Sequence, residues 1–279
     1  MEFAYLGTSG FAAGLLRRLC ESGSTPRLVV TRPDRPAGRG RRLAAPPVAE
    51  TAQELGLALL QPEDVNSPAA VEAIEAAGPE LLVVCAYGAL VGEPLLERYE
   101  ILNVHPSLLP RWRGAAPIER AIMAGDAETG VSIMRLDAGL DSGPVCLARA
   151  EPILADDTWG SLSARLEELG AQLLLEAMGA ERDYVAQDEA QVTWAEKVTA
   201  ADRTLDRSAP AAEQERVVRA LSPHVGARLE LPDGSFLGVL EAHVEDGLLV
   251  PGRVLPPGGR EMGWEDYLRG HGDPFAGQP

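Results

Sequence analysis

The sequence predicts an α/β fold in which a mostly parallel sheet is covered by helices on both faces. Short apolar runs alternate with segments of helical composition, which is the pattern of successive strand–helix–strand units. One run, residues 81–86, is entirely apolar, as expected for a central parallel strand that is buried on both sides. The 279 residues can supply the core of one large domain or of two smaller ones.

The expected elements follow this alternation along the chain. Strands are expected at residues 1–6, 27–31, 81–86, 101–105 and 131–136, and helices at residues 11–20, 48–55, 69–77, 118–123 and 159–178. The glycine turn from Gly7 to Gly10 lacks the G-x-G-x-x-G spacing, and the second strand ends in Thr31 and Arg32 rather than in an acidic residue. We therefore do not expect NAD or FAD binding.

The charge and the cysteines argue against several classes of protein. A net charge of −17 argues against a surface that coats nucleic acid. The three cysteines are scattered, so we expect neither a zinc site nor a disulfide framework, and no metal cofactor. We recognise no signal peptide and no membrane-spanning stretch, which predicts a cytoplasmic protein without a membrane partner.

Asn103 and His105 are the most informative residues of the chain. They lie two apart in a predicted strand, so their side chains leave the same face near its carboxyl end, where open α/β sheets bind ligands. Asn offers an amide donor to a developing oxyanion, and His exchanges a proton near neutral pH. A capped strand end with a hydrogen-bonded His is the alternative, because Asn-x-His alone is a weak motif.

The residues that follow extend this motif. The pair is followed by Pro-Ser-Leu-Leu-Pro, by Arg-Trp-Arg-Gly-Ala-Ala-Pro and by Asp141 in a glycine-flanked loop. Together these segments resemble the catalytic core of the methionyl-tRNA formyltransferase family, whose members use 10-formyltetrahydrofolate. The first of them marks folate-dependent formyltransferases generally. The resemblance covers nearly the whole chain, and its segments are residues 3–11, 32–43, 86–88, 103–117, 130–144 and 259–270.

The resemblance implies catalytic roles for Asn103, His105 and Asp141. It places Asn103 and His105 around the formyl oxygen and folate N10, while Asp141 orients or polarises His105 and accepts the amine proton through water. The chemistry agrees, because an amide donor stabilises charge that appears only in the transition state, and a carboxylate favours the charged form of a nearby imidazole. A helix or turn cap is the alternative role for Asp141.

The resemblance also implies a folate site. Folate contacts are expected from the turn after His105, where two leucines would form an apolar wall, and from the loop after residues 81–85, where small residues would let backbone groups reach a pterin edge. The residues concerned are Ser107, Leu108, Leu109, Pro110, Ala86, Tyr87 and Gly88. Ordinary loop packing is the alternative for the turn.

An arginine-rich loop stands out against the acidic composition. Residues 32–42 contain five Arg and one Asp, a local charge of +4, so the rest of the chain carries −17 − 4 = −21. A concentrated basic loop is a local signal for nucleic acid, although a lone charge run is usually a solvated loop. Its match to the family's acceptor-stem loop implies tRNA contacts by Arg39, Arg41 and Arg42.

We expect two domains joined by a linker. The predicted boundaries are a Rossmann-like catalytic domain at residues 1–190, a linker at 191–205 and a shortened C-terminal domain at 206–279. A helix at 213–221 and strands at 227–231 and 237–244 are expected in the last part, and the resemblance implies a small β-barrel of oligonucleotide-binding type.

This C-terminal region departs from the family pattern. About two strands' worth of chain is missing between residues 242 and 254, so the barrel is incomplete or the missing strands are dispensable. Seven Arg against twelve acidic residues from Asp206 onward give a net charge of −5, which does not support a strongly basic tRNA platform.

The leading hypothesis is a formyltransferase that uses 10-formyltetrahydrofolate as formyl donor and initiator methionyl-tRNA as acceptor. Folate and this tRNA are the expected partners, and we expect a monomer. A folate-dependent formyltransferase acting on a small amine such as an amino sugar is the nearest alternative. A formyltetrahydrofolate hydrolase and a non-catalytic folate-binding protein are further ones, the last disfavoured because Asn103, His105 and Asp141 are all present.

Overall fold

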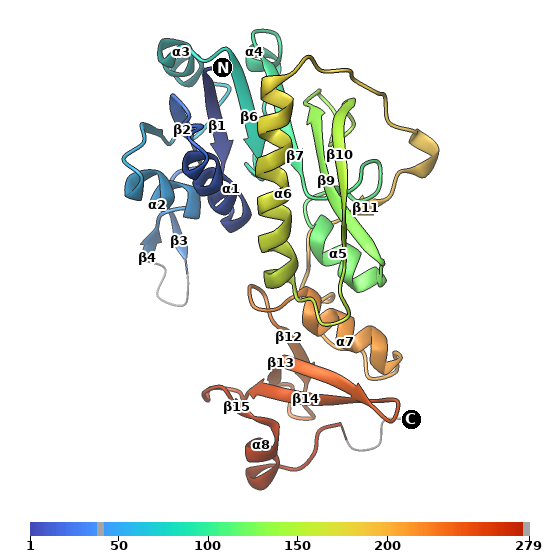
Figure 1. Cartoon of the computed structure of the whole chain (residues 1–279). Helices are drawn as coiled ribbons and strands as arrows, with labels where there is room; N and C mark the ends of the chain where they lie inside the picture. Colours follow the sequence, from blue (N-terminus) through green and yellow to red (C-terminus); the bar gives the residue numbers. More distant parts are fainter. Residues whose placement is uncertain (38–41, 276–279) are drawn as a thin grey trace. The chain divides into compact units, whose positions relative to one another are not determined.

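The computed structural model of the chain describes residues 1–37 and 42–275 (Figure 1). The chain divides into two compact units, each assembled from several segments. Unit 1 comprises Met1–Ala115, Gly130–Glu151 and Ala164–Trp194, and unit 2 comprises Ala116–Thr129, Pro152–Ser163 and Ala195–Pro279. The consecutive domain boundaries expected from the sequence stay a prediction.

Unit 1 is built on a seven-stranded sheet with the order β10-β9-β7-β6-β1-β2-β5. The five strands from β5 to β7 run parallel, and β9 pairs antiparallel with β7, so the mostly parallel sheet is confirmed. The strands are β1 (Phe3–Gly7), β2 (Leu28–Val30), β5 (Leu59–Leu60), β6 (Leu81–Cys85), β7 (Glu100–His105), β9 (Glu128–Arg135) and β10 (Val145–Pro152).

Two strands of this sheet were not expected from the sequence. β5 has only two residues, too few for a periodic pattern. β10 lies at the edge of the sheet and has no fully buried residue, and its four apolar residues 145–148 are followed by the charged Arg149 and Glu151. Cys146 on β10 is accordingly only half-buried, whereas Cys85 on β6 is buried.

The helices of unit 1 begin and end at the expected kinds of residue. Ser9 and Ser67 accept hydrogen bonds from the first turns of the helices that they precede, and Gly78 ends the second of these in a left-handed conformation. The helices are α1 (Gly10–Glu21), α2 (Pro47–Glu54), α3 (Pro68–Ala77), α4 (Glu93–Leu96) and α6 (Trp159–Gly179), which enters unit 1 at Ala164. Only the single-turn α4 was not expected.

Alternate residues of the central strands pack on opposite faces of the sheet. Ala4 and Leu6 of β1 belong to a buried cluster that includes Ile74 of α3. Tyr5, between them, points the other way and donates from its hydroxyl to the carbonyl of Ala12 in α1 at 2.7 Å. α1 and α6 lie together over this second face in Figure 1. The sheet is therefore covered on both sides, as its continuous apolar strands predict.

Unit 2 combines helices with a four-stranded sheet of order β12-β13-β14-β15, in which each neighbouring pair is antiparallel. Its strands are β12 (Ala227–Glu230), β13 (Phe236–Glu245), β14 (Leu248–Leu255) and β15 (Met262–Gly263), and its helices are α5 (Pro117–Ala124), α7 (Ala211–Ala220) and α8 (Trp264–Gly270). Val218 of α7 packs against Leu229 and Val239 of the sheet.

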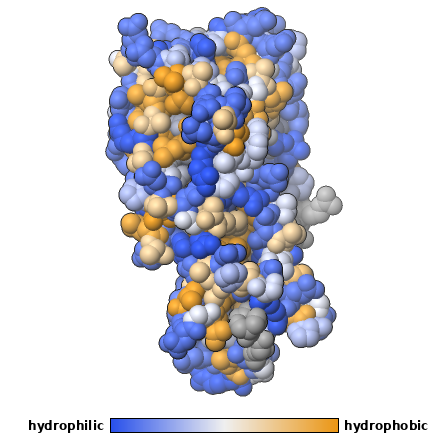
Figure 2. Space-filling model, turned by 90° about the vertical axis from the view of Figure 1, so that its right-hand side faces the viewer, coloured by the Kyte–Doolittle hydropathy of each residue, from blue (hydrophilic) through white to orange (hydrophobic). Residues whose placement is uncertain are grey.

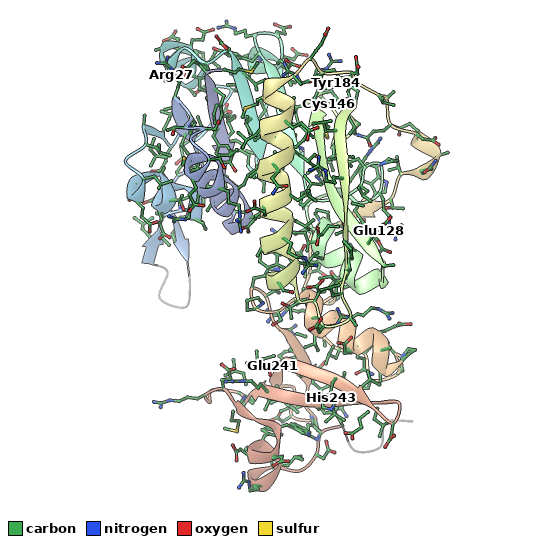
Figure 3. The ribbon with its side chains drawn as sticks, in the orientation of Figure 1. Arg27, Glu128, Cys146, Tyr184, Glu241 and His243 are labelled. Carbon is green, nitrogen blue, oxygen red and sulfur yellow. The ribbon has the colours of Figure 1, made fainter. Side chains whose placement is uncertain are left out.

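The region in which the sequence suggests a loss of strands forms one tight hairpin. β13 and β14 are joined by Asp246 and Gly247, both with positive φ (49° and 79°), the backbone of a two-residue hairpin turn. Glu241 and His243 extend from β13 (Figure 3). β14 was not expected because Pro251 and Gly252 interrupt its apolar run. The small antiparallel C-terminal sheet is confirmed as part of the fold.

The surface mixes polar and apolar side chains, as Figure 2 shows for one face. Large apolar side chains with high exposure include Leu140, Val185 and Trp194. In the part of the chain that the structure describes, no helix has both the length and the apolar character needed to cross a membrane.

Candidate active site

The end of β7 brings the two expected polar side chains to one face of the sheet. Ile101 of the same strand belongs to the buried cluster with Ile74 of α3, and Asn103 and His105 follow it at intervals of two. Val104, between them, faces α6, where its Cγ1 would lie 3.2 Å from a Cβ at Gly170. Asn103 and His105 are 6% and 4% exposed, so their polar groups need partners within the protein.

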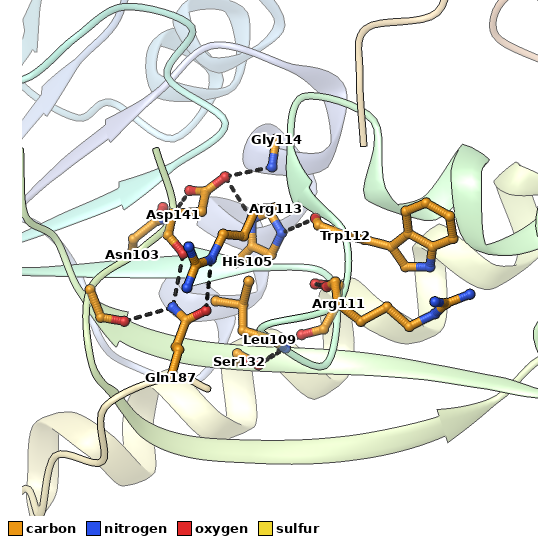
Figure 4. Close-up of polar contacts among 12 residues, drawn as sticks. Asn103, His105, Leu109, Arg111, Trp112, Arg113, Gly114, Ser132, Asp141 and Gln187 are labelled. Carbon is orange, nitrogen blue, oxygen red and sulfur yellow. Dashed lines mark hydrogen bonds and ion pairs between the residues drawn. The ribbon is translucent and has the colours of Figure 1, made fainter. Parts of the chain in front are cut away.

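Asp141 supplies those partners from the loop after β9 (Figure 4). The Asn103 amide Nδ2 donates to Oδ1 of Asp141 at 3.2 Å, and Nδ1 of His105 lies 3.6 Å from Oδ2. The backbone N–H of Gly114 donates to the same Oδ2 at 2.9 Å. The structure thus brings together all three residues that the sequence predicts to be catalytic.

Both ring nitrogens of His105 face acceptors. Nε2 lies 2.8 Å from the carbonyl oxygen of Trp112, which can only accept a hydrogen bond, so Nε2 carries a proton. Nδ1 faces the Asp141 carboxylate at 3.6 Å. The ring is therefore held between a backbone carbonyl on one side and a carboxylate on the other.

The loop between β7 and α5 is held by a second group of polar contacts. Trp112 has φ 66° and its N–H donates to the Thr193 hydroxyl at 2.9 Å, while Gly114 has φ 122°. The Arg113 guanidinium, 3% exposed, donates to the Gln187 side chain and, through both terminal nitrogens, to the Glu189 carboxylate. Sequence reasoning missed Trp112, Gly114 and Gln187, because two of them act through the backbone and no spacing pattern marks the third.

The four residues of the expected folate turn lie directly beside this site. Ser107 is fully buried, and its hydroxyl donates to the carbonyl of Arg111 at 2.6 Å. The Ser132 hydroxyl donates to the Ser107 carbonyl at 2.8 Å and accepts from the Leu109 N–H at 3.1 Å. Leu108 and Pro110 are half-buried. These bonds fix the turn; its folate contacts remain a prediction.

The second expected folate segment has an unusual backbone. Ala86 and Gly88 both have positive φ (43° and 74°), a conformation uncommon for alanine. Tyr87, between them, is buried, and its carbonyl accepts from the Thr8 hydroxyl at 2.7 Å. The Gly88 carbonyl accepts from Arg32 at 3.1 Å. The segment is therefore tied to the loops after β1 and β2, and its pterin contacts remain a prediction.

The arginine-rich loop begins and ends as a hairpin. β3 (Arg35–Ala37) pairs antiparallel with β4 (Arg42–Ala44), in the register Arg35↔Ala44. Arg39 and Arg41 lie outside the described residues, and for Arg42 only the backbone is described. Gln61 ties the base of the hairpin by donating to Asp34 at 2.9 Å and to the carbonyl of Arg32 at 3.0 Å.

Residues 1–37 and 42–275 contain no cluster of three or more His, Cys, Asp and Glu suited to metal binding. The polar groups available to a substrate near His105 are amide, imidazole and carboxylate groups. They suit proton transfer and oxyanion stabilisation during transfer of an acyl group to an amine.

The parallel sheet and this site define the class of a formyl-group transferase, and comparison with known proteins agrees. Residues 1–178 match the family model described as "Formyl transferase". The methionyl-tRNA formyltransferase of Halorhodospira halophila is 43% identical, over 96% of each chain. The chain therefore belongs to the methionyl-tRNA formyltransferase family. That alignment spans 298 positions, more than the 279 residues present here, so the relative has residues without a counterpart in this chain.

Solved structures agree on the fold. A methionyl-tRNA formyltransferase from Clostridium thermocellum matches with a TM-score of 0.67 and 13% identity, over 94% of this chain and 99% of that one. HypX from Aquifex aeolicus in complex with tetrahydrofolic acid matches with a TM-score of 0.66 and 18% identity, over 99% of this chain and 48% of that one.

Proposed function

We propose that the protein transfers the formyl group of 10-formyltetrahydrofolate to the α-amine of methionyl-initiator-tRNA. The observation that carries this proposal is the convergence of Asn103 and His105 on one carboxylate, that of Asp141, in a chain whose relative of that name is 43% identical over nearly its whole length. The bound tetrahydrofolic acid of the HypX structure supports the choice of donor.

The chemistry begins with attack of the neutral amine on the formyl carbon. A tetrahedral oxyanion forms as the new C–N bond is made. One N–H of the Asn103 amide is used on Asp141. Its second N–H and the His105 ring are suited to stabilise the oxyanion. Because both groups are held in place before the substrate binds, little reorganisation is needed when the charge develops.

Collapse of the intermediate then breaks the bond between the formyl carbon and folate N10. N10 must leave with a proton, and the attacking amine must lose one, so the two transfers balance. The 3.6 Å between His105 Nδ1 and Asp141 is longer than a hydrogen bond, which leaves Nδ1 available to exchange a proton with a substrate atom. Asp141 is the carboxylate nearest to accept the amine proton, directly or through water.

Recognition of tRNA rests on the hairpin from Arg35 to Ala44 in this proposal. It is a local concentration of positive charge in a chain of net charge −17, and phosphate binding releases counterions. A small amine acceptor is the second candidate. It is favoured by the net charge of −5 from Asp206 onward and by the tight β13–β14 hairpin in the shortened region.

The proposal is tested with purified protein and 10-formyltetrahydrofolate. Charged initiator tRNA, a panel of amino sugars and a water-only control are offered in parallel, and formylated product and released tetrahydrofolate are measured. We expect formyl-methionyl-tRNA as the main product. Preferential formylation of an amino sugar would replace this function with the second candidate, and tetrahydrofolate release without an amine acceptor would indicate a hydrolase.

A further inference from the structure

The backbone of Asp141 needs support that its own side chain does not give. Its φ is +50°, in the left-handed region, where a non-glycine residue is held only if its surroundings determine it. The Gln187 side chain provides this support. Its amide Nε2 donates to the carbonyl of Asp141 at 2.8 Å and to that of Gly143 at 2.7 Å, so both of its hydrogens are used on the same loop.

Arg113 connects this support to the other side of the site. Its Nε donates to the Oε1 of Gln187 at 2.9 Å. Trp112, the residue before Arg113, presents the carbonyl that faces His105. Gly114, the residue after Arg113, presents the N–H that donates to the Asp141 carboxylate. The position of Arg113 therefore fixes one backbone partner of His105 and one of Asp141 (Figure 4).

The segment that carries Gln187 is itself anchored. Upstream, Tyr184 donates to Glu100 of β7 at 2.5 Å, and Arg182 binds the same carboxylate with two nitrogens. Burial raises the pKa of the Tyr184 hydroxyl well above its usual value, so the hydroxyl stays a donor. Tyr184 and Cys146 lie at the same end of the sheet (Figure 3), and Val185 bridges to Val145. Downstream, Glu189 accepts from both terminal nitrogens of Arg113.

We propose that Gln187 and Arg113 are positioning residues that hold Asp141 at its working distance from His105. The inference rests on the proposed function and deepens it, by extending the site to two side chains that act through others. Gln187 fixes the backbone of Asp141, and Arg113 fixes both Gln187 and the loop that meets the Asp141 carboxylate. Neither is assigned a contact with a substrate.

The kinetic test compares Gln187→Ala with Gln191→Ala, a matched control. Gln191 is exposed, and its side chain donates to Asp188 rather than to the site. We expect Gln187→Ala to lower kcat by on the order of tenfold to a hundredfold, because displacements near 1 Å cost rates of that size. The KM values for folate and tRNA should stay within about twofold of wild type, and the control should match wild type.

A second comparison separates positioning from general damage to the fold. Gln187→Ala is also introduced beside Asp141→Asn. If Gln187 acts through Asp141, Gln187→Ala should lower kcat little further in the Asp141→Asn variant, because the carboxylate that Gln187 positions has already lost its charge. An equal fold-loss of kcat in both backgrounds, or a large rise in either KM, would overturn the proposal.

A spectroscopic test does not depend on the identity of the substrate. The chain has four histidines, so the ring signals of His105 can be followed by NMR against the other three as internal references. Gln187→Ala should change the ring shifts of His105 and their pH titration while the other three stay as in wild type. Unchanged His105 signals would overturn the proposal. Failure of wild type to formylate tRNA would instead remove the proposed function and leave this test valid.

Glu189→Ala provides a variant with little risk to folding, because the Glu189 side chain is 73% exposed. It removes both carboxylate contacts of the Arg113 terminal nitrogens and leaves the Arg113–Gln187 bond in place. We expect Glu189→Ala to lower kcat by a few-fold and to shift the His105 signals less than Gln187→Ala does. A wild-type kcat and wild-type His105 signals in this variant would count against the role of Arg113.

Discussion

Nδ1 of His105 lies 3.6 Å from Oδ2 of Asp141, although one residue ends a buried strand and the other lies in a loop far along the chain. The same carboxylate accepts from the Asn103 amide and from the Gly114 N–H. Asp141 is therefore the residue on which the expected catalytic groups converge. Removal of the Asp141 carboxylate should disturb the orientation of both Asn103 and His105. It should also remove the proposed acceptor of the amine proton.

Alanine at any of the three positions should slow turnover strongly and leave the fold intact. For Asn103→Ala we expect a loss of about a hundred- to a thousandfold in kcat, the usual cost of one oxyanion donor. His105→Ala and Asp141→Ala should cost at least as much. Steady-state formylation assays with circular dichroism as a control for folding test this. Near-normal turnover in all three folded variants would remove these residues from the mechanism.

The sequence was sufficient to predict the core of the site and of the sheet. Asn103 and His105 alternate in an apolar strand, so their common face follows from strand geometry alone. The elements that were missed carry weak local signals: the edge strand β10 has no buried run, and β14 contains Pro251 and Gly252.

The outer contacts of the site could not have been predicted in the same way. The carbonyl of Trp112 and the N–H of Gly114 belong to the backbone, so residue type does not mark them. Gln187 reaches the Asp141 loop from a distant irregular stretch between the isolated β-bridge at Val185 and the 3-10 helix Glu189–Gln191. The hydrogen bond from the Gln187 amide to the Asp141 carbonyl therefore becomes visible only in the folded chain.

Gly143→Ala should destabilise unit 1 and weaken the site. A Cβ at Gly143 would collide with the backbone carbonyl oxygen of Arg135, which cannot rotate away as a side chain could. We expect a loss of about 1–3 kcal/mol in the free energy of unfolding, typical of overpacking, and a lower kcat because the Gly143 carbonyl is also bound by Gln187. Urea unfolding measures the first effect. Gly179→Ala is the control, since nothing lies within 4 Å of its added Cβ; equal stability of both variants would contradict the prediction.

The stability of unit 2 should depend on Asp202 at acid pH. The hydrogen bond from Arg120 lowers the pKa of the Asp202 carboxyl to about 2, and the Thr199 hydroxyl and N–H also donate to it. A lowered folded-state pKa stabilises the fold above the unfolded value near 3.8, and this contribution is lost as the pH falls toward 2.

Asp202→Asn removes this contribution and tests its size. The variant should be less stable than wild type by at most about 2 kcal/mol at pH 6, and the difference should shrink between pH 4 and pH 2 as the wild-type carboxyl takes up a proton. Urea unfolding at several pH values, with the exposed Asp156→Asn as control, measures it. A difference that stays constant across this range would contradict the assigned role.

Chelation should leave formyl transfer unchanged. The site chemistry proposed here needs only an amide, an imidazole and a carboxylate, and a formyl carbonyl needs less polarisation than a phosphoryl group. Because tRNA requires Mg²⁺, this assay uses a small amine as the formyl acceptor and leaves out Mg²⁺. The release of tetrahydrofolate is followed. Loss of that release with a chelator and recovery with zinc would require a metal in the mechanism.

The arginine-rich hairpin should contribute to tRNA binding and not to folate binding. Replacing Arg39, Arg41 and Arg42 with Ala should raise the KM for tRNA and reduce the slope of log KM against log salt concentration by about 2 to 3, because up to three fewer phosphate contacts release counterions.

The matched control replaces Arg17, Arg27 and Arg149, which are exposed, paired with Glu and carry the same total charge. If charge acted only at long range, both triple variants would weaken tRNA binding equally. If the hairpin contacts the tRNA, only the first should change the slope, with the folate KM unchanged in both. An unchanged tRNA KM at low and high salt in the hairpin variant would count against tRNA as the acceptor and favour a small amine.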